Sequence, residues 1–419
     1  MQLFTLLFDL AALTGIAWWL YKQQPDTLKI FYWPALLCKV AAGIMVGLLY
    51  FYYYGAGDTI SYWRDGQLIA ARLTYDPVGT IDFYMNDSPG SLQGLVSEKP
   101  RSLFFVKISG FLALASGGNY WMMSVILSLA SFFGAWYLFS KINRFFPQTR
   151  IAAAVGFLFF PSVVFWSSGL IKESVGLGAL FILTGMVLSI IKREKIYFWE
   201  WCLALVSLWL GWTLKYYWMG VFLPVAVTTM GVTTFIRSRP AFGRFELPIW
   251  AGLFMIVLLV ATSVHPNFYP HRFFDVISQS NLEFMALTRA DNAIHYNNLQ
   301  PTFLSILQNA PWALVAGLFR PFVWEFHNLP SFAAGVENLA LLLLVLMSLP
   351  SLIRFYKGPE KLLALSAIVY IGILSVFLAL ATPNLGTLSR YKIGFLPFLV
   401  FLTLLKSPIM KWVDNKKLG

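Results

Sequence analysis

Residues 362–381 read LLALSAIVYIGILSVFLALA, a stretch without a single charge. A helix of about 20 apolar residues crosses the ~30 Å hydrocarbon layer of a bilayer, so this stretch predicts a transmembrane helix. Similar stretches recur along the chain of 419 residues, which is 58% hydrophobic and only 12% charged. Soluble domains carry about 25% charged residues. The composition therefore excludes a soluble domain and predicts an all-α, polytopic membrane protein.

The apolar stretches predict a transmembrane helical bundle of about 11 spans, which forms a single membrane domain over residues 1–419. These spans are 2–21, 30–54, 119–140, 151–166, 168–191, 197–213, 218–236, 247–264, 331–353, 362–381 and 392–405. Two further stretches, 103–117 and 303–319, are short or interrupted. We expect them to lie at the membrane interface or to dip into the bundle.

The distribution of basic residues predicts the orientation in the membrane. Lys and Arg gather in alternate connections, for example in 141–150, 192–195 and 237–244. The positive-inside rule makes these connections cytoplasmic, with the N-terminus outside and the C-terminus inside. The net charge of +12 then reflects membrane orientation rather than a nucleic-acid partner. The long loops 55–102 and 265–330 form an outer cap, so we expect the protein to act on the outer side of the cytoplasmic (inner) membrane, among its lipids.

The first polar cluster, GAGDTISYWRD from Gly55 to Asp65, follows a predicted span. The glycines end that span, and Asp58 and Tyr62 share a face of the helix that follows. A carboxylate at the membrane surface can act as a general base or hold a divalent cation against a phosphate. Tyr62 and Arg64 are then candidate substrate-binding residues. An N-cap role explains Asp58 equally well.

The second cluster, FPSVVFWSSGLIKES from Phe160 to Ser174, predicts a helical hairpin that turns at the outer face. Lys172 falls in the first turn of the second helix, where its charge opposes the macrodipole and Glu173 complements it. An anion such as a lipid phosphate would offset Lys172, whereas snorkelling toward head groups is the alternative. Because ionisable groups at membrane depth are functional by default, binding is the favoured role.

The third cluster is LFRPFVWEFHN, from Leu318 to Asn328. Arg320 offers a guanidinium for phosphate, and the ring of Trp324 could stack on a sugar. Glu325 and His327 are a candidate acid/base pair. An internal ion pair between Arg320 and Glu325 would explain the same residues without a ligand, so both interpretations stay open.

The fourth cluster is TLSRYK, from Thr387 to Lys392, just before the last predicted span. Arg390 and Lys392 lie on the outer side of the predicted layout, against the inside-positive pattern, so an anion is expected to offset them. The forked guanidinium of Arg390 suits phosphate, with Tyr391 and Lys392 beside it as further binding residues. Simple head-group anchoring is the competing interpretation.

Taken together, the first two clusters resemble the integral-membrane glycosyltransferases of the GT-C class. The resemblance covers residues 30–236, a GT-C-like module that includes the outer loop 55–102, and leaves 237–419 as C-terminal spans with the outer loop 265–330. The late Ser-Arg390-Tyr391 is similar to the arginine motif of polysaccharide polymerases and ligases. The resemblance implies a polyprenyl-phosphate sugar as donor and Asp58 as acceptor-activating or Mg²⁺- or Mn²⁺-binding residue. Many such enzymes have paired acids at this site, whereas Thr59 follows Asp58 here.

The sequence thus predicts a membrane glycosyltransferase or polymerase for cell-surface polysaccharide or glycoconjugate synthesis. Its expected donor is a polyprenyl-phosphate- or diphosphate-linked sugar, and its acceptor is a glycan or a lipid-linked molecule. Asp58 is the expected base, and Glu325 or His327 replaces it if Asp58 is structural. Lys172, Arg320 and Arg390 form the expected cationic clamp. The alternatives are a flippase or transporter for the same lipid-linked glycan and a noncatalytic subunit of an envelope complex.

Overall fold

The structure, a computed structural model, describes residues 2–86, 94–97, 100–263, 269–355, 358, 360–405 and 407. Parts of the predicted outer loops, namely 87–93, 98–99 and 264–268, lie outside the described residues, as does 408–419 at the C-terminus, which was expected inside. In the described part, regular structure is helical except for an isolated antiparallel bridge between Ala293 and Asn384. The predicted all-α class is confirmed.

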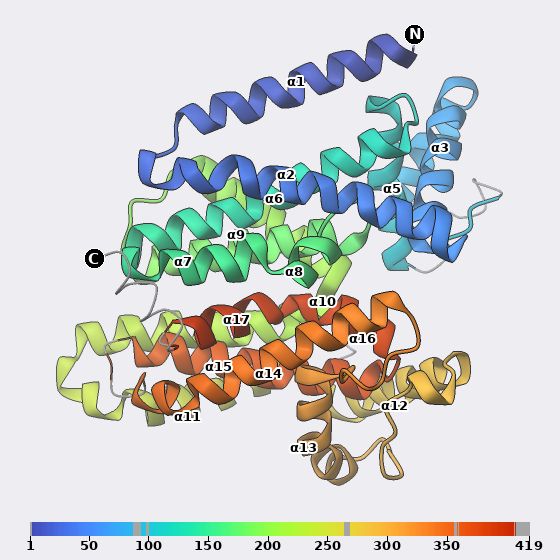
Figure 1. Cartoon of the computed structure of the whole chain (residues 1–419). Coiled ribbons are helices and arrows are strands. Elements are labelled where there is room, and N and C mark those ends of the chain that lie inside the picture. Colours follow the sequence, from blue (N-terminus) through green and yellow to red (C-terminus); the bar gives the residue numbers. More distant parts are fainter. Residues whose placement is uncertain are drawn as a thin grey trace. The chain divides into compact units, whose positions relative to one another are not determined.

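The chain divides into two compact units that interleave along the sequence. Unit 1 comprises Met1–Ser140, Val164–Gly185 and Phe198–Tyr216. Unit 2 comprises Lys141–Val163, Met186–Tyr197 and Tyr217–Gly419. Several helices therefore contribute residues to both units (Figure 1).

Unit 1 is built mainly from the N-terminal helices. Its elements are α1 (Gln2–Lys22), α2 (Asp26–Leu48), the π-helix η1 (Leu49–Tyr54), α3 (Asp58–Tyr75), α4 (Pro77–Asn86), α5 (Pro100–Ala115), most of α6 (Tyr120–Phe145), most of α9 (Lys172–Ile191) and the first part of α10 (Phe198–Ser238).

Small residues allow the helices of unit 1 to approach closely. A Cβ added at Gly134 of α6 would lie 2.5 Å from the backbone oxygen of Gly178 in α9. Similarly, a Cβ at Gly66 of α3 would lie 2.8 Å from the backbone oxygen of Ser109 in α5. Close backbone contact between small residues is a common way for apolar helices to associate in lipid, where the hydrophobic effect between helices is absent.

Unit 2 is built mainly from the C-terminal helices. Its elements are η3 (Pro147–Thr149), α7 (Arg150–Ala153), the π-helix η4 (Ala154–Phe159), the start of α8 (Pro161–Trp166), the rest of α10, η5 (Pro240–Phe245), α11 (Glu246–Ala261), α12 (Pro270–Leu287), η7 (Ala290–Asn292), α13 (Phe303–Phe319), α14 (Leu329–Phe355), α15 (Lys361–Ala381), α16 (Leu385–Tyr391), η8 (Lys392–Gly394) and α17 (Leu396–Leu404).

Helix α15 is the central helix of unit 2, because α12, α13 and α17 all pack against it. A Cβ at Gly317 of α13 would lie 2.5 Å from the backbone oxygen of Ser375 in α15, so α13 also packs through a small residue. A buried cluster that includes Ile277, Ala313 and Ala379 joins α12, α13 and α15. Helix α13 is thereby held firmly against the membrane helix beside it.

The number of spans differs from the sequence prediction. Seven helices of the described chain are long and apolar enough to cross a membrane, or eight if the pair Leu385–Gly394 and Leu396–Leu404, bent by 65°, counts as one. The predicted eleven is therefore not supported as it stands. The helices at the two stretches that were set apart from the spans, α5 and α13, are not among the seven.

Local geometry explains most of the difference. The predicted span 151–166 is interrupted between η4 and α8, because Phe160 is extended (φ −66°, ψ 124°) before Pro161. The predicted spans 197–213 and 218–236 correspond to the two parts of α10, whose 41 residues count as one of the seven helices. A helix of this length measures about 60 Å, twice the thickness of a bilayer core. The backbone leaves helical geometry at Lys215 (φ −140°, ψ 51°), which divides α10 into two parts.

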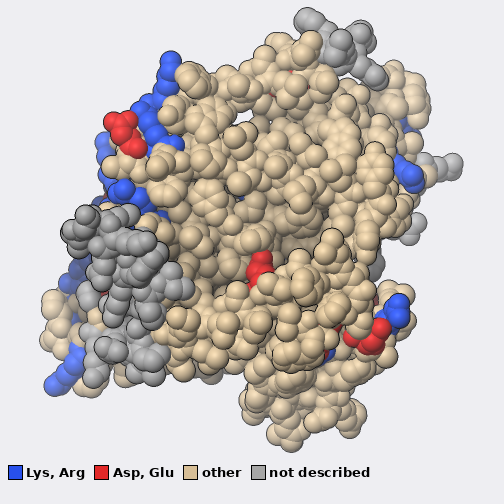
Figure 2. Space-filling model, in the orientation of Figure 1, with Lys and Arg blue, Asp and Glu red and all other residues tan. Residues whose placement is uncertain are grey.

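The surface agrees with a membrane protein. Figure 2 shows a face on which uncharged atoms predominate and Lys and Arg gather near the edges. Along α10, the side chains of Phe198, Leu205 and Trp209 are largely exposed. Apolar exposure on this scale marks a site of lipid or protein contact in a chain that is otherwise poor in charge.

Candidate functional site

Asp58 begins α3, an 18-residue helix, as the glycines before it predict. The preceding helix ends at Tyr54, and Gly55 (φ 68°) and Gly57 (φ 134°) adopt left-handed backbone conformations that glycine tolerates best. The Asp58 side chain is exposed at the N-terminal end of the helix. The positive end of the helix dipole favours a carboxylate there, whether or not that carboxylate also reacts.

The two other candidates on α3 have different environments. Tyr62 is 2% exposed, and its ring packs edge-on against Phe105 with 4.8 Å between centroids. The Lys172 ammonium lies 5.3 Å from the centre of the same ring. Arg64 is exposed. Tyr62 is thus a core residue that also contacts Lys172 through its ring, whereas Arg64 lies on the surface of unit 1.

The second cluster contains a buried ion pair that the sequence analysis missed. Lys172 lies in the first turn of α9, as predicted, although the helix begins at Lys172 and not at residue 168. Lys215 Nζ donates to Glu173 Oε1 at 2.6 Å, and the side chains are 3% and 0% exposed. The sequence signal that could have revealed this pair is Lys215, a lysine between two apolar stretches. At this residue α10 leaves helical geometry. Glu173 therefore has a buried cationic partner in addition to its place at the start of α9.

Three segments of unit 1 meet around this ion pair. Lys172 Nζ donates to Ser102 Oγ at 3.2 Å, which joins α9 to the start of α5. The neighbouring Arg101 guanidinium lies 5.1 Å from the ring centre of Tyr216, directly after Lys215. The segments that meet here carry the basic residues Arg101, Lys172 and Lys215, of which Lys215 contacts the Glu173 carboxylate. This composition is suited to an anionic ligand.

In unit 2, the third cluster forms the internal ion pair that the sequence left open. Arg320 donates to both carboxylate oxygens of Glu325, from Nε at 3.0 Å and from Nη2 at 2.6 Å. The backbone N–H of Phe322 also donates to Glu325, at 2.8 Å. Bidentate pairs of this kind fix the orientation of both groups. The Glu325 carboxylate therefore fixes the position of the Arg320 guanidinium in this structure.

The fourth cluster contacts the third through Lys392. Its side chain is 1% exposed, and its ammonium donates to Asn338 Oδ1 and lies 3.5 Å from the backbone oxygen of Arg320. Asn338 in turn donates to the backbone oxygen of Pro321 at 2.9 Å. The Glu337 carboxylate attracts the same ammonium. Such burial contradicts head-group anchoring by Lys392, because an anchoring ammonium must reach the lipid surface.

The remaining candidates of unit 2 lie in different environments. Arg390 is 8% exposed, and the ring of Tyr391 lies 6.1 Å from that of Tyr217. Trp324 is 71% exposed and stacks on Phe322 at 4.9 Å. The exposed His327 has Nε2 3.1 Å from the backbone oxygen of Asp291. Arg320 and Lys392 thus share a buried site, and Trp324 and His327 lie on the surface of the same unit.

The chain has no match among protein-family models, curated proteins or solved structures. The features that bear on its function are therefore two basic clusters. One contains Lys172 and Glu173 in unit 1, and the other contains Arg320 and Lys392 in unit 2.

A divalent cation at Asp58, as the sequence predicts, would need further ligands beside this carboxylate. Within the described ranges, no group of three or more His, Cys, Asp or Glu side chains could hold a metal ion. Mg²⁺ is often bound by one or two carboxylates together with substrate phosphates. The residues around Asp58 do not by themselves make a metal site, so we derive no catalytic step through a metal.

Proposed function

We propose that this protein is an integral-membrane glycosyltransferase or polymerase of the GT-C type, which acts on polyprenyl-phosphate- or diphosphate-linked sugars. The observation that carries the proposal is the contact of the buried Lys392 ammonium with the backbone oxygen of Arg320, 72 residues away, which brings two basic residues to neighbouring positions in unit 2. Cations that are already held in place can stabilise the charge that develops on a leaving phosphate. The product would be a cell-surface polysaccharide or glycoconjugate, with a glycan or lipid-linked acceptor.

We place the reaction at the outer face of the cytoplasmic (inner) membrane, with the N-terminus outside and the C-terminus inside. Eleven crossings are reached if α1, the segment 150–166 and the bent pair α16–α17 each cross once and α10 crosses twice at its Lys215 break. The basic connections then remain cytoplasmic. Cysteine labelling at Thr74 and Ser238, which are both exposed, tests this topology: a cysteine at Thr74 must react with an impermeant reagent from outside, and one at Ser238 must not.

The proposed transfer needs a base and an anion-stabilising group. The acceptor hydroxyl attacks the anomeric carbon, the bond from that carbon to the phosphate oxygen breaks, and the base takes the hydroxyl proton. Asp58 is the first candidate base because it is an exposed carboxylate at a helix N-terminus. Glu325 and His327 are the alternatives, although the bidentate contact with Arg320 makes Glu325 a poor proton acceptor.

The decisive experiment incubates the purified full chain with lipid-linked sugar extracted from its host. Formation of a new glycosidic bond, detected by mass spectrometry of the glycan, supports the proposal. An unchanged glycan in the presence of every lipid fraction of the host contradicts it. Lys392→Met should reduce the product, whereas Arg289→Gln, at an exposed residue of the same unit, should leave it unchanged.

A flippase for the same lipid-linked glycan is the second candidate, because unit 1 buries charges within its apolar helices. Lys39 of α2 is 4% exposed and donates to the backbone oxygen of Ser167 at 2.9 Å, and Lys215 and Glu173 are also buried. A flippase moves the lipid across the bilayer without forming a bond. Reconstitution in vesicles, followed by the accessibility of the lipid-linked glycan to an impermeant enzyme, distinguishes the two functions.

A further inference from the structure

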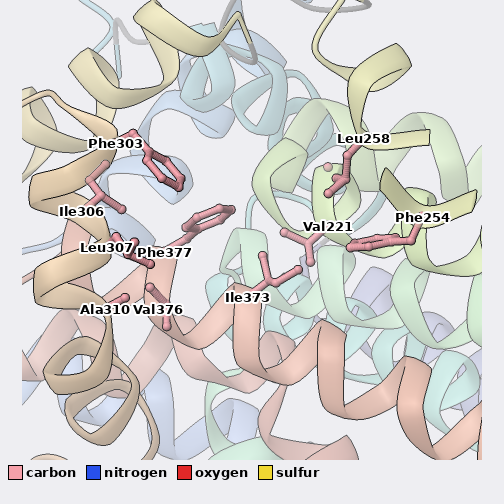
Figure 3. A pocket seen from close by; sticks show the side chains of 11 residues that line it. Val221, Phe254, Leu258, Phe303, Ile306, Leu307, Ala310, Ile373, Val376 and Phe377 are labelled. Carbon is pink, nitrogen blue, oxygen red and sulfur yellow. The ribbon is translucent and has the colours of Figure 1, made fainter. Parts of the chain in front are cut away.

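Unit 2 contains an apolar cavity of about 270 Å³. Figure 3 shows its labelled side chains, which come from α10, α11, α13 and α15. Not one of the residues that line it has a polar side chain; they are Gly220, Val221, Phe254, Leu258, Phe303, Ile306, Leu307, Ala310, Ile373, Val376 and Phe377. Because a cavity with such a lining offers no hydrogen-bond partners to water, its natural occupant is apolar.

The cavity reaches the surface of its unit along α13. Phe303 is 64% exposed and Leu307 is 55% exposed, although both line the cavity. In the proposed topology, the lining residues of α11 and α15 lie in the outer halves of those helices. An apolar chain in the outer leaflet could therefore enter beside the first two turns of α13.

Helix α13 connects this cavity to the buried cations. Ala310 lines the cavity, and Arg320 directly follows the last residue of the helix. At 1.5 Å per residue the two positions lie about 15 Å apart along the helix axis. The intervening residues, PWALVAGLF, include no charged or hydrogen-bonding chain other than the indole of Trp312. The path from the cations to the cavity is therefore apolar almost throughout.

We propose that this cavity holds part of the prenyl chain of a polyprenyl phosphate whose phosphate is bound at the Arg320 end of α13. The inference rests on the proposed function, for which it specifies the site of the lipid. At roughly 30 Å³ per water-sized group, the cavity has room for about nine such groups, close to two five-carbon prenyl units. A prenyl phosphate is hydrocarbon from its first carbon onward, which suits the apolar path. The ester groups of a phospholipid would find few donors along it.

The test is photolabelling of the full chain in lipid nanodiscs with geranylgeranyl phosphate that carries a diazirine at the far end of its chain. We expect cross-links in the peptides that contain 303–310 or 373–377, and competition by unmodified geranylgeranyl phosphate. Labelling confined to other helices, or equal competition by phosphatidic acid, overturns the proposal. The second result would show a general site for lipid chains.

Substitutions that fill the cavity sharpen the test. Ala310→Phe should reduce labelling at these peptides at least fivefold, whereas Ala340→Phe, the same exchange at an exposed position of α14, should not. Leu307→Trp is a second filling variant at a half-exposed wall position, in case Ala310→Phe fails to fold. Undiminished labelling in a folded filling variant overturns the proposal.

The labelling does not require sugar transfer, so the two proposals can fail separately. Specific labelling of a protein that forms no glycosidic bond supports the prenyl site and contradicts the proposed transferase. Glycosidic bond formation without labelling at α13 or α15 supports the proposed transferase and contradicts the prenyl site.

Discussion

Lys215 Nζ lies 2.6 Å from Glu173 Oε1, and the two side chains are among the most completely buried charges of the described chain. The contact joins the break in α10 to the first turn of α9, 42 residues away. Burial of two charges is costly unless both are well paired. The pair therefore ties the start of α9 to the middle of α10.

Breaking this pair should destabilise unit 1 strongly. Glu173→Gln leaves the Lys215 ammonium buried without its carboxylate, and removal of one partner of a buried pair costs about 3–5 kcal/mol. The double variant Glu173→Gln/Lys215→Met removes both charges and should be more stable than the single variant. Denaturant unfolding in detergent, followed by tryptophan fluorescence, measures both. Arg72→Gln, in the partly exposed pair with Asp76, should change stability by at most about 1 kcal/mol. If Glu173→Gln lowers the free energy of unfolding no more than Arg72→Gln does, the pair has no such structural role.

The sequence predicted the helices and several of their ends, because these depend on local residue patterns. The place of Lys172 in the first turn of α9 and the glycine-rich end before Asp58 are local features of this kind. The ion pair between Arg320 and Glu325 was also foreseen as an alternative, since the two residues are only five apart. The break in α10 at Lys215 also lies between the two apolar stretches, 197–213 and 218–236, that predicted separate spans.

Contacts between distant segments could not be predicted in this way. Lys392 meets Asn338 and the backbone of Arg320, which are 54 and 72 residues away, only because η8 packs in the same unit as α14 and the end of α13. The partner of Glu173 depends in the same way on the packing of α10 against α9. Charge pattern alone indicated that these residues need partners, and the tertiary structure selects which ones.

Asp65 should be required for the order of the segment 94–97. Its side chain is 1% exposed and accepts the backbone N–H groups of Val96, at 2.9 Å, and Ser97, at 3.2 Å. Asp65→Asn keeps the shape but leaves one buried donor without an acceptor, which costs about 1–3 kcal/mol. Limited proteolysis should show faster cleavage near these residues in Asp65→Asn. The exposed control Asp26→Asn should be cleaved like the wild type, and equal resistance of Asp65→Asn would contradict the prediction.

Arg320 should be sensitive to a conservative exchange. A lysine cannot reproduce the two parallel contacts with Glu325, so Arg320→Lys leaves that carboxylate partly unpaired. Truncation of one partner of a buried charge pair costs about 2–5 kcal/mol; because lysine keeps the charge, the loss in kcat/KM for the lipid-linked donor should be measurable but smaller than that. Arg289→Lys, in an exposed pair, is the matched control. Wild-type kinetics in Arg320→Lys would remove Arg320 from the proposed phosphate site.

The stability of unit 2 should fall in acid through Glu194. Burial by itself would raise the pKa of the Glu194 carboxyl, but hydrogen bonds from Lys141 and Ser189, together with the charges of Lys141 and Arg144, lower it below the ordinary value of 4.5. A pKa that is lower in the folded state contributes stability that is complete above the ordinary value and is lost as the pH falls through the lowered one. Unfolding between pH 7 and pH 3 should therefore show a smaller acid-induced loss in Glu194→Gln than in the wild type. An unchanged pH profile in Glu194→Gln would assign the acid sensitivity to other groups.

A substitution of Asp58 tests whether this residue is the catalytic base. If Asp58 takes the proton of the acceptor hydroxyl, Asp58→Asn should lower turnover by about 10²- to 10⁴-fold, the contribution typical of a positioned general base. Stability should change little, because the side chain is exposed. Asp82→Asn, another exposed carboxylate of unit 1, is the matched control. Full activity of Asp58→Asn, combined with loss of turnover in His327→Ala, would show that His327 and not Asp58 is the base. The imidazole Nε2 of His327 lies 3.1 Å from the backbone oxygen of Asp291 in unit 2.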